Sequence, residues 1–593
     1  ASGVNIEDGG EFEPLRLEGY TATMLYDYEQ LSDELDKADE QKKELPLIIY
    51  RHSEKKLVRL TNDNIWLLKL PECEKKNIVW GSVCWDEAKK SCDIYDVMLP
   101  KTYSELKEYA SRHGVEIESA VSGILDKKDD TSFSFIIILA IMRSKKLIGV
   151  NSYYQFVNFE IICEADADGK CVLTPNSTVK FHKHESPFTT KKAHEISNLD
   201  TEINPSLIIA GCGALGSKIA MHLVRSGITN ILFCDPDYLS DHNLCRHALL
   251  DKSVYKNKAS EMRSATNLIY YHEMLKADAS CRGIKTILGD AEIMSKRTPD
   301  YLLDFTASKV AHNQLVNIRN RPTAISAAIF DNGKFGLLMS EGNNGEVRLD
   351  DVMAAFFAQY KTDPIVSSYL MREKELSREP SSLLNVGLGC NSETFILADD
   401  IISLYAASMS VTIKDIFAGN HANGGCWMYI SDKLGSLKIQ KIEVPQFYCY
   451  DVDTWKVHIF NKVVNDIADQ TKAAGRYETG GYLIGQCNLK TNTIHVIDTI
   501  EAPEDTIHRG DYLVLGKAGI RKKLSQVERR TGGTFGYVGE WHSHPNGPSE
   551  FSATDLEEFA NKAEEMKADC TTRPILELLV SPIGISCAVL TLH

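Results

Sequence analysis

Long hydrophobic runs are missing from this chain of 593 residues. The longest apolar run, Phe135 to Met142, is too short to span a bilayer, and no signal peptide opens the sequence. Basic charge is in deficit, because 66 Lys and Arg stand against 82 Asp and Glu and leave a net charge of −16. Such a chain has no general affinity for nucleic acid phosphates. We therefore expect neither a membrane nor a nucleic acid as a partner.

Paired cysteines are missing as well. The 15 cysteines are scattered, with no Cys-x-x-Cys pair and no clustering typical of disulfides. This usage suits a reducing cytoplasm, in which a few thiols can be catalytic. The sequence has no internal repeats or low-complexity tracts, and its hydrophobic content of 43% is ordinary for a soluble globular protein. Length and pattern together predict a multidomain α/β protein.

Possible metal ligands are concentrated near the C-terminus. His542 and His544 are two residues apart, so on an extended strand both imidazoles point to the same side. Asp555, eleven residues after His544, can complete the ligand set from the start of a helix and leave a fourth position open for water. A catalytic zinc ion needs this open geometry, because it lowers the pKa of bound water to about 7.

Written as His-x-His-Pro-x6-Ser-x2-Asp, this stretch resembles the JAMM (MPN+) signature of zinc metalloproteases that remove ubiquitin-like proteins. Upstream, Glu478-Thr-Gly-Gly-Tyr-Leu-Ile-Gly485 looks like the first element of that family, in which a Glu is the general acid and base. The resemblance implies that His542, His544 and Asp555 hold Zn²⁺. It also implies that Glu478 transfers protons and that Ser552 helps to stabilise the oxyanion.

A glycine loop lies between two predicted strands in the middle of the chain. Ser206 to Ala210 predicts a buried strand, Gly211-Cys-Gly-Ala-Leu-Gly216 follows it, and a predicted helix (217–226) leads to the strand Ile231 to Cys234. Gly211, Gly213 and Gly216 let the backbone approach phosphate at the helix N-terminus. Asp235 is placed to bind ribose hydroxyls. These residues alone predict a nicotinamide dehydrogenase as readily as another nucleotide enzyme.

The next segment separates these classes. Asp235-Pro-Asp237 precedes Ser240-Asp-His-Asn-Leu-Cys-Arg-His247, and Lys258 lies twelve residues after Arg246. This order resembles ThiF-like activating enzymes, the family of ubiquitin-activating enzymes and their sulfur-carrier relatives. The resemblance implies that Asn243, Arg246 and Lys258 hold ATP while a C-terminal glycine is adenylated. Cations beside the phosphates stabilise the charge that develops there.

The chain departs from this family at several places. His247 stands where the family has Gln, and Asn257 lies in a lysine loop that is less polar in the family. The family's D-x-T-D segment, whose second Asp helps to hold Mg²⁺, corresponds to Asp304-Phe-Thr-Ala307 here. Either Asp304 or another carboxylate supports Mg²⁺, or adenylation is weakened. The family's paired Cys-x-x-Cys zinc site is missing, so we expect no structural zinc in this domain.

Cys390 is the candidate for a thioester. It lies in Gly387-Leu-Gly-Cys390-Asn-Ser-Glu-Thr394, before a predicted helix (395–407). A Gly-flanked cysteine at a helix start has a lowered pKa. The segment resembles the stretch that carries the catalytic Cys in bacterial activating enzymes of antiviral operons. The alternative is a buried cysteine that acts only as a small hydrophobic residue.

Three domains are expected: residues 1–195, an N-terminal α+β domain; 196–443, a Rossmann-like adenylation domain with a parallel-rich sheet; and 444–593, an α/β JAMM (cytidine-deaminase-like) domain. The polar stretch 182–200 is interpreted as a linker. Related operons often place a conjugating-enzyme-like domain first, but its His-Pro-Asn motif is absent here, and Cys84 and Cys171 are the only faintly suitable thiols. A degenerate conjugating-enzyme-like domain and a plain substrate-docking domain are equally open.

Together these patterns resemble a bacterial fusion of an activating enzyme with a zinc peptidase. The expected partners are a ubiquitin-like protein with a C-terminal glycine, a conjugating enzyme or target protein, and a second copy of the chain bound through the adenylation domain. Adenylation with ATP and Mg²⁺, capture on Cys390 and cleavage of the same kind of tail by the peptidase form the main interpretation. The alternatives are thiocarboxylate formation on a sulfur carrier, a scaffold in which only the zinc peptidase is active, and, most distantly, a nicotinamide oxidoreductase.

Overall fold

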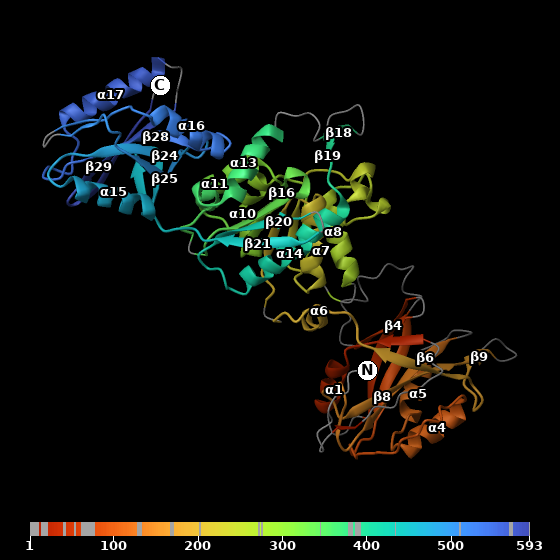
Figure 1. The fold of residues 1–593 in the computed structure, drawn as a ribbon. Helices are drawn as coiled ribbons and strands as arrows, with labels where there is room; N and C mark the ends of the chain where they lie inside the picture. Colours follow the sequence, from red (N-terminus) through yellow and green to blue (C-terminus); the bar gives the residue numbers. More distant parts are fainter. Residues whose placement is uncertain are drawn as a thin grey trace. The chain divides into compact units, whose positions relative to one another are not determined.

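The computed structural model divides the chain into two compact units, Ala1–Phe188 and Thr189–His593 (Figure 1). Within the described residues, no helix combines the length and the apolar character needed to cross a bilayer. The structure describes residues 11–12, 22–38, 43–52, 55–60, 78–126, 133–165, 171–200, 203–270, 273, 277–343, 345–376, 383–385, 393–432, 435–508, 512–568 and 573–591.

The first unit is built on a closed sheet with the strand order β11-β2-β4-β3-β5-β6-β8. The central strand β6 sends alternate residues into two apolar clusters, one containing Ile137 and helices α4 and α5, the other containing Ile138 and helix α1. Burial on both sides explains why this strand has a continuous apolar sequence. The bounds are β2 (Ala22–Leu25), β3 (Glu44–His52), β4 (Lys55–Leu60), β5 (Ile78–Trp85), β6 (Ser134–Met142), β8 (Tyr154–Ile162), β11 (Val179–Glu185), α1 (Tyr28–Asp36), α4 (Tyr103–Arg112) and α5 (Glu118–Leu125).

The polar stretch 182–200, interpreted above as a linker, includes the boundary between the two compact units after Phe188. It contains the end of β11 and helix α6 (Thr190–Ile196). His182 is buried in β11, and its Nε2 lies 2.9 Å from Glu160 Oε2. A polar side chain with a buried partner thus fills an inward position of this strand.

The second unit begins with a sheet of strand order β14-β13-β12-β15-β16-β17-β20-β21. Strands β14 to β16 pair in parallel, and the remaining three pair antiparallel. The connections run in opposite directions from β12, so a ligand site is expected where β12 and β15 end side by side. The strands are β12 (Leu207–Ala210), β13 (Ile231–Cys234), β14 (Asp278–Ser280), β15 (Tyr301–Asp304), β16 (Thr323–Phe330), β17 (Phe335–Ser340), β20 (Gly425–Ser431) and β21 (Leu437–Ile442). The helices are α7 (Ala214–Arg225), α8 (Lys258–Ile269), α9 (Ile284–Leu288), α10 (Ala291–Arg297), α11 (Lys309–Asn317), α12 (Leu349–Ala358), α13 (Pro364–Leu376) and α14 (Asp399–Phe417).

The C-terminal part of this unit is a mixed sheet of strand order β22-β23-β25-β24-β28-β29-β30. The pattern 457–474 predicts one helix, but Trp455–Phe460 forms strand β23 and helix α15 (Asn461–Ala474) begins only after it. The other strands are β22 (Phe447–Val452), β24 (Gly480–Asn488), β25 (Thr493–Glu501), β28 (Gly536–Ser543), β29 (Ile575–Ser581) and β30 (Gly584–Leu590). The other helices are α16 (Ile520–Arg530) and α17 (Ala553–Ala568).

One apolar core joins the two sheets of the second unit. It runs from strands of the first sheet through α12 and α13 to β23, β25 and β28 of the second sheet. The rings of Phe357 and Phe535 lie 4.9 Å apart within it. At its edge the hydroxyl of Tyr360 donates a hydrogen bond to Asp498 Oδ2 at 2.9 Å. The two sheets therefore share buried surface as parts of one domain do.

Candidate active sites

The second sheet brings His542, His544 and Asp555 into one group, with a ligand atom of each within 4.8 Å of the others. His542 lies on β28, His544 just after it, and Asp555 in the first turn of α17. Asp555 Oδ1 is 3.6 Å from His542 Nε2, and Oδ2 is 3.4 Å from His544 Nε2. Two ligands about 2.1 Å from one zinc ion in tetrahedral geometry are separated by roughly 3.4 Å. The spacing therefore fits a metal ion.

Hydrogen bonds to the other ring nitrogens set the tautomers of both histidines. His542 Nδ1 lies 3.0 Å from Glu577 Oε1, and His544 Nδ1 lies 3.2 Å from the carbonyl oxygen of Pro548. Because each Nδ1 donates its proton to an oxygen, each Nε2 keeps a lone pair for a metal. His542 Nε2 is buried and has no hydrogen-bond partner. A buried nitrogen without a hydrogen-bond partner fits the role of a metal ligand.

Glu577 was missed by the sequence reasoning. It is buried on β29 directly opposite Glu540 of β28, next to the strand that carries the histidines. The available signal was a single acidic residue in the otherwise apolar strand Ile575–Ser581. Its position relative to His542 comes only from strand pairing.

Negative charge dominates this group of residues. Burial lowers the pKa of His542, but the carboxylates of Asp555 and Glu577 outweigh burial and raise that pKa to about 9. Burial raises the pKa of Asp555, but the bonds from His542 and Ser552 outweigh it and hold that pKa well below its usual range. The surroundings thus stabilise a positive charge, which a bound dication would supply.

Ser552 and Asp555 hold each other at the start of α17. The backbone N–H of Asp555 donates to Ser552 Oγ at 3.1 Å, and the N–H of Ser552 donates to Asp555 Oδ2 at 2.6 Å. This reciprocal cap fixes the carboxylate toward the histidines. Ser552 Oγ accepts this bond, so its own hydroxyl proton is still available for an oxyanion.

One cavity of about 740 Å³ is lined by the three grouped ligands together with Ser552 and Glu577. Glu478 is buried just before β24, on the same cavity wall as the metal ligands. Lys562 of α17 also lines it and forms an ion pair with Glu540, 2.5 Å from Nζ to Oε2. The cavity can therefore hold an acid/base, an oxyanion donor and a metal around one substrate.

The glycine loop occupies the end of β12. Gly211 has φ +87°, and a Cβ there would lie 2.8 Å from the backbone of Phe305. A Cβ on Gly216 would lie 2.0 Å from the carbonyl oxygen of Gly211. Gly213 is the N-cap of α7 and has no neighbouring atom within 4 Å of such a Cβ. The first and third glycines allow close packing, whereas the second leaves an open approach to the helix N-terminus.

Asp235 and His247 brace this loop. Asp235 is buried, and its Oδ2 accepts the N–H of Cys212 at 2.7 Å. His247 Nε2 lies 2.6 Å from the carbonyl oxygen of Cys212, and the N–H of Leu249 donates to His247 Nδ1 at 3.0 Å. Burial lowers the pKa of His247 to about 4. The neutral imidazole supplies one donor and one acceptor, as the expected glutamine amide would.

The structure brings part of the predicted ATP site together. Arg246 lines a cavity of about 660 Å³ with Ala214 and Leu215 of the loop–helix junction and with Thr306 and Ala307 after β15. Asp304 pairs in register with Ala210, and its carboxylate accepts two bonds from Thr306.

Arg246 is the predicted ligand among the residues that line this cavity, and Lys258 and Asn243 are not among them. Lys258 Nζ lies 3.4 Å from Asp237 Oδ2, and Asn243 Oδ1 accepts the N–H of Ser240 at 3.1 Å. The loop, Arg246 and Asp304 are therefore assembled at the C-terminal edge of the sheet. Lys258 and Asn243 are held in local contacts.

Of the three cysteines considered as thioester carriers, the structure describes the side chain of Cys84. Cys390 lies outside the described residues. Cys84 is fully buried on β5, and burial raises its pKa far above the ordinary value, so it is a poor nucleophile. The side chain of Cys171 also lies outside the described residues.

The fold and these residues define a mixed α/β enzyme with a nucleotide-binding sheet and a second sheet suited to metal-dependent hydrolysis. Comparison with protein families gives the particular domains. Residues 201–331 match the ThiF family, and residues 460–588 match the prokaryotic homologs of the JAB domain. The chain thus carries a ThiF family domain and a JAB-like domain.

Two proteins of Enterobacter hormaechei subsp. hoffmannii (strain UCI 50) are similar to parts of the chain. A CD-NTase/cGAS isopeptidase is 28% identical over 130 residues, which are 22% of this chain and 71% of that protein. The ATP-dependent ubiquitin transferase-like protein Cap2 is 35% identical over 103 residues, 17% of this chain and 16% of that protein. The similarity to Cap2 therefore concerns a small part of its length.

Solved structures show only a distant likeness. E. coli MccB with succinimide is 16% identical, with a TM-score of 0.28, over 41% of this chain and 64% of that chain. PaaA is 14% identical, with a TM-score of 0.28, over 42% of this chain and 68% of that chain. These values carry no functional conclusion.

Proposed function

We propose that the chain activates a ubiquitin-like protein with ATP and hydrolyses bonds at the same kind of C-terminal tail. The glycine loop with Arg246 and the His542–His544–Asp555 group in one chain are the observation that carries this proposal. The two relatives support it, because one is named an isopeptidase and the other an ATP-dependent ubiquitin transferase-like protein. The expected partners are the carrier, a conjugating enzyme or target, and a second copy of the chain.

In the adenylation half, the carrier's carboxylate attacks the α-phosphorus of ATP and pyrophosphate leaves. The open N-terminus of α7 at Gly213 and the guanidinium of Arg246 stabilise phosphate charge. Lys258 reaches the phosphates by exchanging its contact with Asp237 for them. Asp304 would hold Mg²⁺, and the Cys390 thiolate then displaces AMP to form a thioester.

In the peptidase half, His542, His544 and Asp555 would hold Zn²⁺, which supplies Lewis acidity and lowers the pKa of water. Glu478 accepts a proton from the attacking water and delivers it to the leaving amine. Ser552 donates its hydroxyl to the oxyanion, and Glu577 keeps His542 in the required tautomer. Lys562 and Glu540 lie where charged groups of a substrate would pass.

Pyrophosphate exchange in the presence of the carrier tests the first half. Wild-type chain should exchange label in a manner that depends on the carrier's free C-terminal glycine, and Lys258→Ala should abolish exchange. Lys252→Ala, which removes an exposed lysine near by, is the matched control and should exchange normally. Carrier-dependent exchange that survives Lys258→Ala contradicts the role of this lysine.

Mass spectrometry of the adduct tests Cys390. Cys390→Ala should retain pyrophosphate exchange and lose a thiol-sensitive adduct with the carrier, whereas Cys281→Ala, at an exposed cysteine, should keep both. An unchanged adduct in Cys390→Ala assigns the thioester to another cysteine.

One observation favours a second candidate function, in which only the peptidase is active. Ala307 lines the nucleotide cavity at the position where a second carboxylate would hold Mg²⁺. Absence of exchange in the wild-type chain with any C-terminal glycine carrier, together with intact peptidase activity, would establish this scaffold function.

A further inference from the structure

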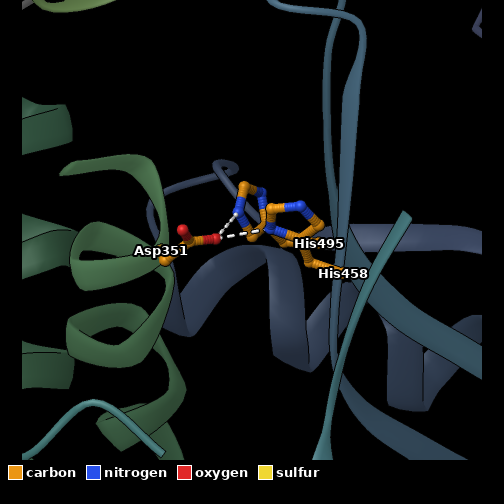
Figure 2. A group of neighbouring side chains, drawn as sticks. All are labelled: Asp351, His458 and His495. Carbon is orange, nitrogen blue, oxygen red and sulfur yellow. Dashed lines mark hydrogen bonds and ion pairs between the residues drawn. The ribbon is translucent and has the colours of Figure 1, made fainter. Parts of the chain in front are cut away.

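A second group of possible metal ligands lies away from both active sites. Asp351, His458 and His495 are buried, and one ligand atom of each lies within 4.8 Å of the others. Figure 2 shows Asp351 on helix α12 facing the two imidazoles on strands β23 and β25. His458 Nδ1 is 2.6 Å and His495 Nε2 is 2.9 Å from the same oxygen, Asp351 Oδ1. The neighbouring strands hold the histidines directly opposite each other.

This group repeats the construction of the catalytic one. Asp351 and Asp555 are each the third residue of a helix, and each faces two imidazoles from the second sheet. The backbone N–H of Arg348 donates to Asp351 Oδ2 at 2.8 Å, as that of Ser552 does to Asp555 Oδ2 at 2.6 Å. In Asp351 the other oxygen, Oδ1, faces both imidazoles, whereas in Asp555 each oxygen faces one imidazole. Such outer hydrogen bonds are typical of metal-binding carboxylates.

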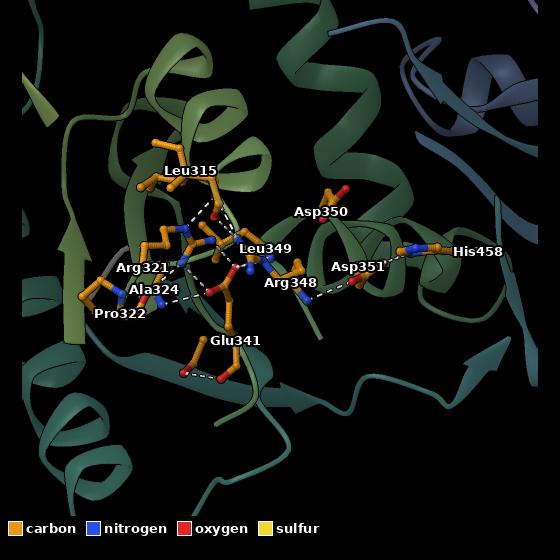
Figure 3. A network of polar contacts seen from close by, with 12 residues as sticks. Leu315, Arg321, Pro322, Ala324, Glu341, Arg348, Leu349, Asp350, Asp351 and His458 are labelled. Carbon is orange, nitrogen blue, oxygen red and sulfur yellow. Dashed lines mark hydrogen bonds and ion pairs between the residues drawn. The ribbon is translucent and has the colours of Figure 1, made fainter. Parts of the chain in front are cut away.

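The start of α12 is itself held in place. Figure 3 shows Glu341 receiving the guanidinium of Arg321, with both nitrogens 2.7 Å from its two oxygens. Glu341 Oε1 also accepts the N–H of Leu349 at 2.9 Å, and Arg348 binds the carbonyl oxygens of Leu315 and Ile318. This network preorganises the helix start that presents Asp351.

Asp350 adds a second carboxylate. Its side chain is 10% exposed, and its Oδ2 lies 3.8 Å from His495 Nε2. Its Oδ1 is buried and has no hydrogen-bond partner. Two buried carboxylates beside two imidazoles favour positive charge at this place, because an uncompensated buried charge costs several kcal/mol. One dication with two neutral imidazoles supplies such charge.

We propose that Asp351, His458 and His495 bind a second divalent metal ion of the zinc class, with Asp350 as the fourth donor. Metal binding requires a lone pair on His458 Nδ1 and His495 Nε2: a ring protonated on both nitrogens releases one proton to solvent, and a neutral ring carries its proton on the other nitrogen. The nitrogen–oxygen separations then widen to roughly 3.4 Å, a shift of less than an ångström for each side chain. With protein donors only and no exposed side, this site is structural, and it fastens α12 of the nucleotide-binding domain to the peptidase sheet.

Zinc content of four purified full-length proteins tests the proposal. Wild type should hold two zinc ions per chain, His542→Ala/His544→Ala one, His458→Gln/His495→Gln one, and the variant with all four substitutions none. Glutamine is chosen because it fills the space and can still donate a hydrogen bond to Asp351. His421→Ala removes another histidine–aspartate pair (His421 Nε2 to Asp415 Oδ2, 2.6 Å) and should leave the zinc content at two.

The outcomes separate this site from the catalytic one. One zinc ion in wild type and none in His542→Ala/His544→Ala overturns the second site and leaves the catalytic assignment intact. The same nonzero zinc content in these two proteins overturns the catalytic assignment alone, and no zinc in either overturns both sites. If the glutamine variant does not fold, the His542→Ala/His544→Ala protein still decides, because it retains the second site. Its cobalt derivative should show the visible absorption of four-coordinate Co²⁺, and a colourless protein that takes up no cobalt contradicts the proposal.

Discussion

At the scale of single residues, the hydrogen bond made by one ring nitrogen of a histidine determines whether the other ring nitrogen carries a proton or a lone pair. Glu577 and the carbonyl oxygen of Pro548 occupy Nδ1 of His542 and His544, so each Nε2 faces the cavity. His247 donates from Nε2 to the carbonyl oxygen of Cys212 in the glycine loop and accepts the N–H of Leu249 at Nδ1. The same type of side chain can therefore serve as a metal ligand in one sheet and supports the loop through hydrogen bonds in the other.

Glu478→Gln should retain zinc and lose peptidase activity. Glu478 lies on the cavity wall but is not one of the three grouped ligands, so the amide removes a proton acceptor without removing a metal donor. The expected loss in kcat is roughly 10²–10⁴-fold, measured by cleavage of a carrier fusion. Glu504→Gln, at an exposed turn, is the control. Cleavage by the Glu478 variant at the wild-type rate would contradict a role of this residue in proton transfer.

His247 should make the nucleotide-binding domain sensitive to acid. Burial lowers the pKa of His247 from 6.5 in the unfolded chain to about 4 in the folded chain. At a pH between these two values, His247 is protonated in the unfolded chain and neutral in the folded chain. The stability it contributes is complete above pH 6.5 and is lost as the pH falls toward 4, by about 3 kcal/mol at most. His247→Gln keeps a donor and an acceptor and cannot titrate. Melting temperatures at about pH 7.5 and pH 5 should differ less in this variant, and equal differences would contradict the assignment.

At the scale of elements, close approach determines how each glycine of the loop is used. Helix α7 can leave β12 at its observed position only because residue 216 has no side chain. The N-cap residue 213 has free space around it. Packing requires a glycine at one position, and access requires it at the other.

Gly216→Ala and Gly213→Ala should therefore separate stability from nucleotide binding. A Cβ at residue 216 would lie 2.0 Å from the carbonyl oxygen of Gly211. The Gly216→Ala variant should therefore have a lower melting temperature and weaker ATP binding. A Cβ at 213 meets no protein atom within 4 Å, so its melting temperature should stay near wild type while ATP binding weakens. Calorimetric titration with ATP and thermal melting measure the two effects. A Gly213→Ala chain that binds ATP normally would mean that phosphate does not approach this residue.

At the scale of the whole molecule, the second unit behaves as one body with two kinds of chemistry. Its apolar core is continuous from the parallel sheet to the peptidase sheet, and the Asp351 group lies where α12 meets β23 and β25. Burial of this common surface favours keeping the two halves together. The expected domain boundary at residue 444 therefore marks a change of function rather than a gap in packing.

Limited proteolysis should follow this organisation. Cleavage between the compact units, near residues 188 and 189, should release the first unit before any fragment that begins near residue 444 accumulates. Proteases cut where local opening costs little, and separating the two sheets would expose the common core. Gel analysis with mass spectrometry of the fragments measures the order. Early release of residues 444–593 would show that the two halves fold independently.

Local spacing was enough to predict much of the fold and the individual motifs. The strands predicted at Ser206 to Ala210 and Ile231 to Cys234 are confirmed as Leu207–Ala210 and Ile231–Cys234, because each has a continuous apolar pattern. The helix predicted over 457–474 was wrong at its start. Residues 457–460 belong to strand β23, which pairs with β22 and β25. The glycine loop and the His-x-His segment were recognisable because neighbouring residues on one strand or turn share a direction.

Only the tertiary structure decided which distant residues meet. Glu577 reaches His542 across 35 residues, His458 reaches Asp351 across 107, and His495 reaches it across 144. No spacing rule connects such positions, because strand order and the packing of α12 against the second sheet place them side by side. The sequence by itself therefore determined the candidate ligands of the glycine loop and the catalytic group. Strand pairing and helix packing decided the residues that orient them and the second metal site.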